Sequence, residues 1–290
     1  MPLTRRKFIR NIGVTAGGLS MGGFLKSRRA WAEQTEEGSG TSGQVEIEWL
    51  GHGSFLFESP KGLKLLLDPW ISTNPKCPGK YKDISKFSKI DFILWTHGHV
   101  DHFMLNDASD LIEMYKPKVI APWELGFFIK EEIPIADCQT FTLANKGATA
   151  DYDGLRITMV EAFHSAGAQL TGFKGINRFV GEAVGYIFEF ENGLKVYHSG
   201  DTSLMGDMKT IIGDFYQPDV AILPIGGVFT MGSREAAFAC SMIKPGIAIP
   251  EHYGTFPVLE QSSEVFIKEV NRLAPETRVL DIRPGRPVKV

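Results

Sequence analysis

Three histidines and an aspartate lie within the heptapeptide THGHVDH, residues 96–102 of a 290-residue chain that contains only seven histidines. The heptapeptide follows the apolar run 92–95, which is predicted to form a strand. Its polar side chains are therefore expected at the carboxyl end of a strand, where open α/β sheets place their ligand sites. Imidazole and carboxylate groups suit zinc, iron or manganese, so this stretch predicts a metal site.

The spacing within the heptapeptide favours two metals over one. Alternate residues of an extended loop can converge on one point, so His97 and His99 can share an ion. Asp101 and His102 lie beyond the turn and can serve a second ion. The alternative is a solvated loop that is merely rich in histidine, but histidine is the commonest metal ligand.

Other candidate ligands occur at the same kind of position. His164, Asp201 and His252 each follow a short apolar run that is typical of a strand. His52 in LGHGSF and His198 in YHSGDT also lie beside glycine at strand ends. Any one of these would be an ordinary core or surface residue, but together their placement favours a single site.

The elements that must position these residues can be traced along residues 45–290. Runs of strands with helices between them predict two sheets covered by helices on the outside, in one domain. The predicted strands are 45–49, 54–58, 63–67, 92–95, 119–121, 140–143, 155–162, 183–190, 194–198, 220–224 and 247–251, and the predicted helices are 105–115, 124–132, 203–215, 233–243 and 259–273.

Residues 1–32 predict an export signal. An RR pair at 5–6 followed by KFI is similar to a twin-arginine signal, and AWA at 30–32 fits a cleavage site. The apolar stretch 12–25 is too short and glycine-rich for a membrane span. We expect a periplasmic or otherwise exported protein with no stable membrane span after signal removal; an uncleaved anchor is the alternative. Residues 33–44, EQTEEGSGTSGQ, predict a flexible linker.

The charge of the remaining chain limits its partners. The formal net charge is −3, and it falls to −10 without the seven basic residues of 1–32, a segment that contains no acidic residue. An acidic body argues against nucleic-acid binding, which needs basic surface to neutralise phosphates. We therefore expect a small-molecule substrate. The sequence leaves the oligomeric state open, with a homo-oligomer as one possibility.

Over residues 45–290 the chain resembles the metallo-β-lactamase superfamily. The resemblance rests on the order of the HxHxDH motif, the later histidine, the aspartate in GDT and the final histidine. Several finer motifs resemble those of the superfamily's UlaG-like metal-dependent hydrolases. They are WLGHGSFLFE, LLLDPW, THGHVDH, FHSAG, YHSGDT, PDVAILPIGG, FTMG and PEHYGTF. The resemblance implies a four-layer αββα sandwich with the site at one edge of the sheets. It also implies two divalent metal ions, zinc first, with manganese or iron as alternatives.

The same resemblance implies a metal-binding role for individual residues. A carboxylate between two cations reduces their mutual repulsion and fixes their spacing. The implied ligands are His97, His99 and His164 for the first metal, Asp101, His102 and His252 for the second, and Asp201 as the bridge.

Three further residues are expected to support the ligands. Asp68 in LLLDPW matches the family aspartate that holds the HxHxDH loop. His52 and His198 lie outside the common ligand set, so we predict that they orient ligands or contact the substrate.

The implied reaction is attack on an ester, lactone or amide carbonyl by a hydroxide bridged by two metals. Asp201 and Asp101 are then the catalytic carboxylates, with Asp101 able to relay a proton while it binds metal. Hydrolysis of a phosphodiester or other phosphoester at the same site is the alternative, and non-catalytic metal binding is a weaker one. Oxygen-reducing diiron relatives carry glutamate where this chain has His99, which argues against them.

Two segments are expected to contact the substrate. The stretch SAGAQLTGFKGINRFVGE after His164 offers Lys174 and Arg178 to an anionic substrate, and Phe179 among other apolar side chains to an apolar one. An ordinary solvated loop is the alternative. Thr255, close to the final histidine, is predicted to bind a ligand or to hold the turn.

Overall fold

The apolar runs of the sequence form two β-sheets in the computed structural model, which describes residues 43–133, 145–169 and 177–290. These residues belong to one structural unit, Thr41–Val290. The predicted signal (1–32), nearly all of the predicted linker (33–44), the predicted strand 140–143 and Lys174 lie outside the described residues.

The first sheet has six strands in the order β15-β1-β2-β3-β4-β5. Neighbouring strands from β15 to β3 pair antiparallel, whereas β3, β4 and β5 are parallel. The strands are β1 (Glu46–Gly51), β2 (Ser54–Glu58), β3 (Lys64–Leu67), β4 (Phe92–Leu94), β5 (Lys118–Ile120) and β15 (Val288–Lys289).

The second sheet has seven strands in the order β14-β13-β12-β11-β10-β7-β6. Strands β11 to β14 are parallel, and β10 pairs antiparallel with both β11 and β7. The strands are β6 (Thr149–Tyr152), β7 (Leu155–Glu161), β10 (Val184–Glu189), β11 (Lys195–His198), β12 (Val220–Pro224), β13 (Ile247–Glu251) and β14 (Arg278–Val279). A separate ribbon pairs β8 (Gly167–Gln169) with β9 (Asn177–Phe179).

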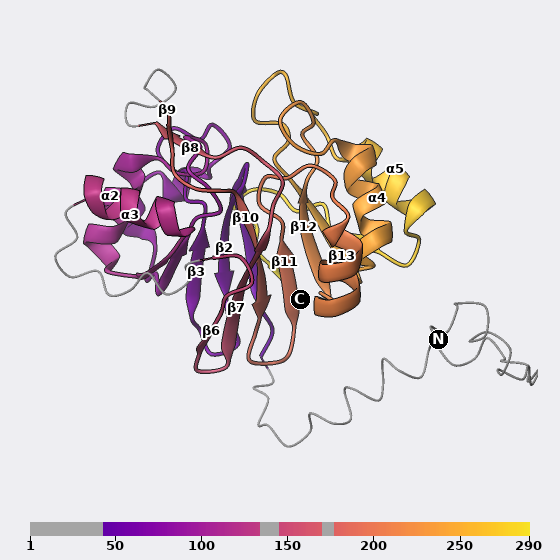
Figure 1. Cartoon of the computed structure of the whole chain (residues 1–290), viewed down its shortest axis with the longest axis horizontal. Helices are drawn as coiled ribbons and strands as arrows, with labels where there is room; N and C mark the ends of the chain where they lie inside the picture. The colour runs from indigo at the N-terminus through magenta and orange to yellow at the C-terminus, as the bar shows by residue number, and fades with distance from the viewer. Residues whose placement is uncertain (1–42, 134–144, 170–176) are drawn as a thin grey trace, which may run out of the picture. The chain divides into compact units, whose positions relative to one another are not determined.

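Helices cover the outer faces of both sheets, as Figure 1 shows. Helices α2 and α3 lie against the first sheet, and α4, α5 and the π-helix η5 lie against the second. Their bounds are α2 (Leu105–Tyr115), α3 (Trp123–Glu132), α4 (Ser233–Ile243), α5 (Glu264–Leu273) and η5 (Met208–Tyr216), with short 3₁₀ turns η2 (Gly79–Tyr81) and η3 (Ile84–Lys86). None of the helices in the described residues has the length and apolar character needed to cross a membrane.

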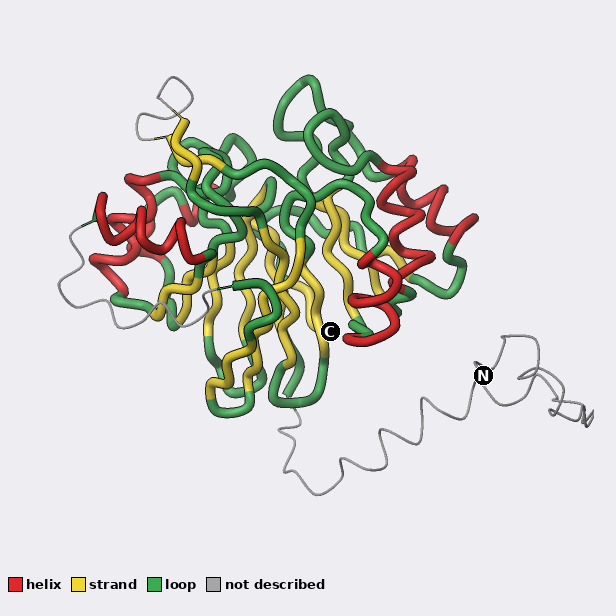
Figure 2. Tube along the Cα trace, viewed as in Figure 1, coloured by secondary structure: helices red, strands yellow, loops and turns green. Residues whose placement is uncertain are grey.

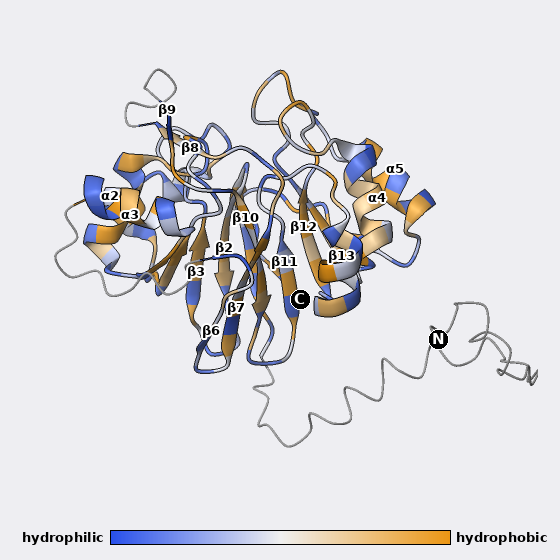
Figure 3. Ribbon diagram, viewed as in Figure 1, coloured by the Kyte–Doolittle hydropathy of each residue, from blue (hydrophilic) through white to orange (hydrophobic). Residues whose placement is uncertain are grey.

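Three hydrophobic cores hold these four layers together. The central core lies between the sheets and includes Phe55, Phe57 and Phe188. One outer core packs the first sheet against α2 and α3, and the other packs the second sheet against α4, α5 and η5. Because both faces of each sheet are largely covered, strands such as β3, β4 and β12 read as nearly continuous apolar runs, and Figure 3 shows hydrophobic colour along much of the sheets. The predicted αββα sandwich is thus confirmed.

Most predicted elements lie within two residues of their predicted bounds, and two helices begin later than predicted. The helix predicted at 203–215 begins at Met208; the backbone N–H of Ser203 is instead donated to Phe163 O, outside any helix. The helix predicted at 259–273 begins at Glu264, because Gln261 donates to the carbonyls of Phe256 and Leu259 and closes a loop instead. The loops at the end of the sandwich beside β8 and β9 stand out in Figure 2.

Candidate metal centre

Six strands deliver the candidate residues to one edge of the sandwich. Because β2 is antiparallel to β1 and β3, and β3 is parallel to β4, the strands β1, β3 and β4 all run in the same direction. Strands β7, β11 and β13 share a direction in the second sheet for the same reason. The site residues follow these strands in turn: His52 after β1, Asp68 after β3, 97–102 after β4, His164 after β7, Asp201 after β11 and His252 after β13.

A first cluster consists of His97, His99 and His164. One ring nitrogen from each of the three lies within 4.8 Å of the others. His97 Nε2 is 3.0 Å from His99 Nδ1, and His164 Nε2 is 3.3 Å from the same atom. Three converging imidazole nitrogens form a typical zinc-binding set.

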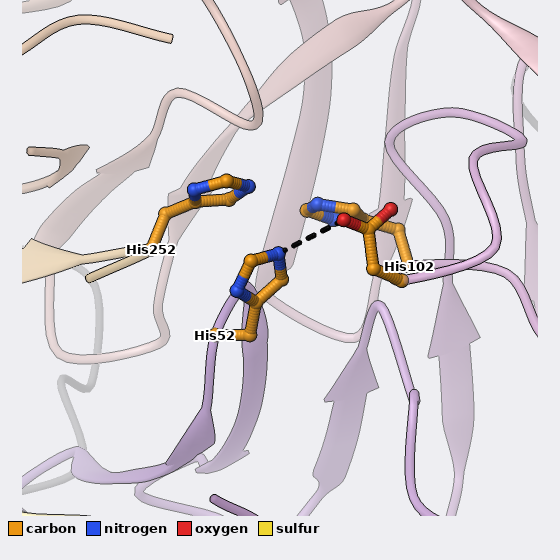
Figure 4. A group of neighbouring side chains, drawn as sticks. His52, His102 and His252 are labelled. Atoms are coloured by element: carbon orange, nitrogen blue, oxygen red, sulfur yellow. Dashed lines mark hydrogen bonds and ion pairs between the residues drawn. The ribbon is translucent and has the colours of Figure 1, made fainter. Parts of the chain in front are cut away.

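A second cluster consists of His52, Asp101, His102 and His252. One potential ligand atom from each lies within 4.8 Å of the others. His52 Nε2 is 3.1 Å from Asp101 Oδ2, and the ring centroids of His52 and His252 are 3.7 Å apart. Figure 4 shows the three histidines of this cluster around a common space, with the His52–Asp101 contact dashed.

Asp201 lies between the two clusters. Its Oδ2 is 3.9 Å from His97 Nε2 and 3.6 Å from His164 Nε2. On the other side, Oδ2 is 3.2 Å from His252 Nε2, and Oδ1 is 3.3 Å from His102 Nε2. One buried carboxylate therefore faces imidazoles of both clusters, as a bridging ligand would.

The polar atoms that face one another here are not satisfied by the protein. His102 Nε2, His252 Nε2 and Asp201 Oδ1 are buried and make no hydrogen bond to the described residues, despite their short separations. Buried polar groups in native proteins are normally paired, so a group of converging unpaired atoms fits a site that binds a ligand. Nitrogen and carboxylate atoms that converge without hydrogen bonding fit divalent cations.

Protonation in this site follows from burial and from the carboxylates. Burial lowers the pKa of His97 well below its usual value, and burial likewise lowers the pKa of His99 and His164. These imidazoles are therefore neutral, which is the form that binds metal.

In the second cluster, His102 and His252 show the opposite shift. Burial, the largest single influence, would lower the pKa of His102 and His252, but the nearby carboxylates together raise both values. These carboxylates are Asp201 and Asp68 at His102, and Asp201 with a smaller effect of Asp101 at His252. Burial would raise the pKa of Asp201, yet His102 and His252 hold it well below its usual value. Asp101 is held ionised in the same way against burial, chiefly by its hydrogen bond to His52. The carboxylates thus attract positive charge, which a bound cation would supply.

Asp68 supports the loop that carries both clusters. Its Oδ1 accepts from the backbone N–H of Thr96, and its Oδ2 accepts from Thr96 Oγ1 at 2.6 Å. Oδ2 also lies 2.9 Å from His102 Nδ1, which leaves Nε2 of that ring directed at Asp201. A carboxylate behind a histidine fixes its tautomer and orientation in this way in metal sites.

His52 lies within the second cluster, whereas the sequence predicted only that it orients ligands or contacts the substrate. Its burial lowers its pKa to about 4, so the ring is neutral, and Nε2 faces Asp101 within the second cluster. His52, Asp68 and His252 all have positive φ angles, of 56°, 44° and 56°. Left-handed backbone at residues other than glycine is strained and concentrates at functional sites. No sequence motif signals this conformation for histidine.

His198 belongs to neither of the two clusters. The ring is buried and 3.4 Å from Glu251, a residue that sequence reasoning missed because it reads as the end of an apolar strand. Thr255 donates from Oγ1 to the carbonyl of Tyr253, so it holds the turn.

A pocket of about 630 Å³ opens onto both clusters. Its size is within the usual range for small-molecule sites. Arg178 does not line it, because its guanidinium pairs with Glu131 and Glu132 of α3. The predicted contact of Arg178 with an anionic substrate stays a prediction, and in this structure its guanidinium faces α3. The lining residues are His99, Asp101, His164, Ser165, Asp201, Val228, Phe229, His252, Phe256 and Val258.

Comparisons with known proteins agree with this geometry. A family model described as a beta-lactamase superfamily domain matches residues 46–252. A UPF0173 metal-dependent hydrolase of Herpetosiphon aurantiacus is 40% identical over 240 residues, which cover 82% of this chain and 95% of the relative. Another, from Methanobrevibacter smithii, is 39% identical over 241 residues and covers 83% of this chain and 95% of the relative.

A solved structure is similar as well. Igni18, a metallo hydrolase from the hyperthermophilic archaeon Ignicoccus hospitalis, superposes with a TM-score of 0.71 at 30% identity. The match covers 85% of this chain and 98% of Igni18. The chain therefore belongs to the metallo-β-lactamase superfamily, among its metal-dependent hydrolases.

Proposed function

We propose that this protein hydrolyses a carboxylic ester, lactone or amide with two divalent cations held by the two clusters. The observation that carries the proposal is the position of Asp201, whose carboxylate faces imidazoles of both clusters within 3.9 Å. A bridging carboxylate is the arrangement that two-metal hydrolases use to hold their ions at a fixed spacing.

Bound there, two divalent cations would supply an activated water and positive charge opposite the oxygen on which negative charge develops. The protein's own residues set up that step. Asp68 and Thr96 hold the loop that carries both clusters, and His52 orients Asp101 at the mouth of the pocket. Asp101 is the least buried member of its cluster, and its carboxylate can accept a proton from the attacking water and pass it to the departing group.

Zinc is the proposed ion, since six histidines and two carboxylates form the two clusters and the bridge. Manganese and iron accept the same donors and are the alternatives. A carbonyl substrate is favoured over a phosphoester, because the described residues that line the pocket include two aspartates and neither lysine nor arginine. The metals alone would have to balance a phosphate group.

The first test is the metal content of protein purified without chelator, measured by elemental mass spectrometry. About two ions per chain are expected, and Asp201→Ala should lower that number and abolish hydrolysis of 4-nitrophenyl acetate. Asp207→Ala is the matched control, because Asp207 is exposed and makes no side-chain cap to η5. Wild-type metal content and activity in Asp201→Ala would contradict the two-metal proposal, and faster cleavage of bis(4-nitrophenyl) phosphate would favour the phosphoester alternative.

A further inference from the structure

Two loops place apolar side chains around the mouth of the metal pocket. The loop after β12 contributes Val228 and Phe229, and the loop after β13 contributes Phe256 and Val258. Val228, Phe229 and Val258 are 68%, 57% and 57% exposed, which is unusual for apolar side chains that sit together. We call these four residues the apolar rim. Exposed apolar patches of this kind commonly mark ligand-binding surfaces.

The two loops are joined to each other by the backbone. Glu260 donates its N–H to Gly226 O, and Gly254 donates its N–H to Glu260 O. Gly226 itself must be a glycine, since a Cβ there would lie 2.1 Å from the carbonyl oxygen of His252. The rim is therefore fixed relative to a candidate metal ligand before any substrate arrives.

Val228 occupies a strained position in this rim. Its φ angle is 59°, and Phe229 donates its N–H to Gly227 O at 2.6 Å, which closes a γ-turn around Val228. A positive φ is a rare outlier for a β-branched residue, and this kind of γ-turn is rare and strained. The strain turns the valine side chain outward over the pocket, where glycine would relieve the strain but leave no apolar contact.

The charges around the pocket restrict what the rim can hold. Among the described residues, the lining contains two carboxylates and neither lysine nor arginine. Lys76 packs against Gly254 outside the lining, and Arg178 is engaged by Glu131 and Glu132. A charged group bound away from the metals would thus meet the apolar side chains of the described lining and no lysine or arginine there, which is unfavourable.

We propose that the apolar rim binds an uncharged alkyl or acyl group of the substrate, next to the carbonyl that is cleaved. This inference rests on the proposed hydrolase function and adds the class of substrate: a neutral ester, lactone or amide with an aliphatic chain. The chain lies across Val228, Phe229, Phe256 and Val258 while the carbonyl lies over the two clusters.

The turnover test compares 4-nitrophenyl esters on zinc-loaded protein. From acetate through butyrate to hexanoate, kcat/KM should rise roughly twofold or more for each methylene; full burial corresponds to about fourfold. The anionic half-ester mono-4-nitrophenyl glutarate should be cleaved at least about tenfold more slowly than the hexanoate, since its carboxylate meets no cation at the rim. Rates that do not depend on chain length, or a preference for the half-ester, would overturn the proposal.

Phe229→Ala is the decisive variant. It should lower kcat/KM for the hexanoate about five- to tenfold and leave the acetate within about twofold, because only the longer chain reaches the ring. Phe215→Ala is the matched control: Phe215 is 73% exposed on η5 and does not line the pocket. An equal loss on both esters in Phe229→Ala, or the same chain-specific loss in Phe215→Ala, would overturn the proposal.

A binding measurement tests the apolar rim independently of ester hydrolysis. Alkyl hydroxamic acids chelate metals through the same head group, so calorimetric affinities from acetohydroxamic to hexanohydroxamic acid report the chain alone. A rise with chain length that Phe229→Ala removes supports the rim even if no ester is cleaved, in which case only the proposed hydrolysis fails. A flat series counts against the rim. If Phe229→Ala instead changes the oligomeric state or abolishes binding to neutral phosphatidylcholine vesicles, the rim serves another occupant and the proposal is wrong.

Discussion

His198 Nε2 lies 3.4 Å from Glu251 Oε2, and both side chains are fully buried. Gly200 donates its backbone N–H to His198 Nδ1, so the ring proton is on Nε2 and faces the carboxylate. Neither carboxylate oxygen of Glu251 has a hydrogen-bond partner among the described residues. The pair links the ends of β11 and β13, from which the chain continues to Asp201 and His252.

Glu251→Gln is therefore expected to weaken metal binding about 10- to 100-fold, the usual range for residues that orient metal ligands. The amide has the same shape, so circular dichroism should show an unchanged fold. Competition with a chromogenic chelator measures the affinity. The matched control is Glu48→Gln, because Glu48 is also buried but bonds Tyr81, away from either cluster. Equal metal affinities in Glu251→Gln and Glu48→Gln would mean that the His198–Glu251 pair does not orient the metal ligands.

Asp68→Asn should lower both metal affinity and turnover about 10- to 100-fold. An amide keeps one acceptor for the Thr96 N–H but cannot accept from both Thr96 Oγ1 and His102 Nδ1, so the His102 ring loses its fixed direction. Metal titration and steady-state kinetics check this. Asp107→Asn serves as the comparison, because Asp107 is a buried acceptor for the N–H groups of Ile71 and Ser72. That variant should lose stability without losing metal affinity, and the opposite ranking would refute the assignment.

Gly53→Ala should disturb the second cluster selectively. A Cβ at residue 53 would lie 2.4 Å from His102 Cε1, so the imidazole must move away from Asp201. We expect about one ion per chain in place of two, measured by elemental analysis after dialysis. Gly79→Ala is the control, since no atom lies within 4 Å of a Cβ there. Two retained ions in Gly53→Ala would show that His102 tolerates the shift or is not a ligand.

Removal of the metal should lower the melting temperature by roughly 5–15 °C, because a ligand at 100 to 1,000 times its Kd stabilises the native state by about 3–4 kcal/mol. The effect has a structural basis, since the first sheet supplies His97, His99 and His102, and the second supplies His164, Asp201 and His252. Thermal denaturation followed by circular dichroism, before and after chelation and after zinc is restored, measures it. An unchanged melting temperature would indicate that the ions do not join the two sheets.

Arg178→Ala should leave kcat/KM within about twofold for neutral and anionic esters alike. Its ion pairs with Glu131 and Glu132 are exposed, and such pairs contribute only about 0–1 kcal/mol to stability. A selective loss on the anionic ester would restore the sequence-based expectation that this arginine binds substrate.

The sequence was sufficient to predict most of the fold and the candidate ligands. Buried strands read as apolar runs, and the residue that follows each run marks the edge of the sheet, so His97, His164 and His252 could be found one by one. The late start of α5 could not, because it depends on hydrogen bonds between Gln261 and carbonyls within the same loop.

Contacts that depend on tertiary packing could not be predicted from the sequence. Glu251 belongs to a strand by pattern, and only the position of β11 beyond β12 brings it to His198. Arg178 looked available to a substrate because nothing in its own segment reveals the glutamates of α3. Likewise, no sequence pattern predicted the left-handed backbone of His52 and Val228.

The common direction of the six strands has a consequence for how the protein folds. The residues of the site are drawn from both sheets, from His52 near the start of the described chain to His252 near its end, so no short segment contains a complete site. The contacts that assemble it are separated by most of the sequence, and chains with such non-local contacts fold slowly. A site built from residues of both sheets is therefore complete only once the two sheets have docked.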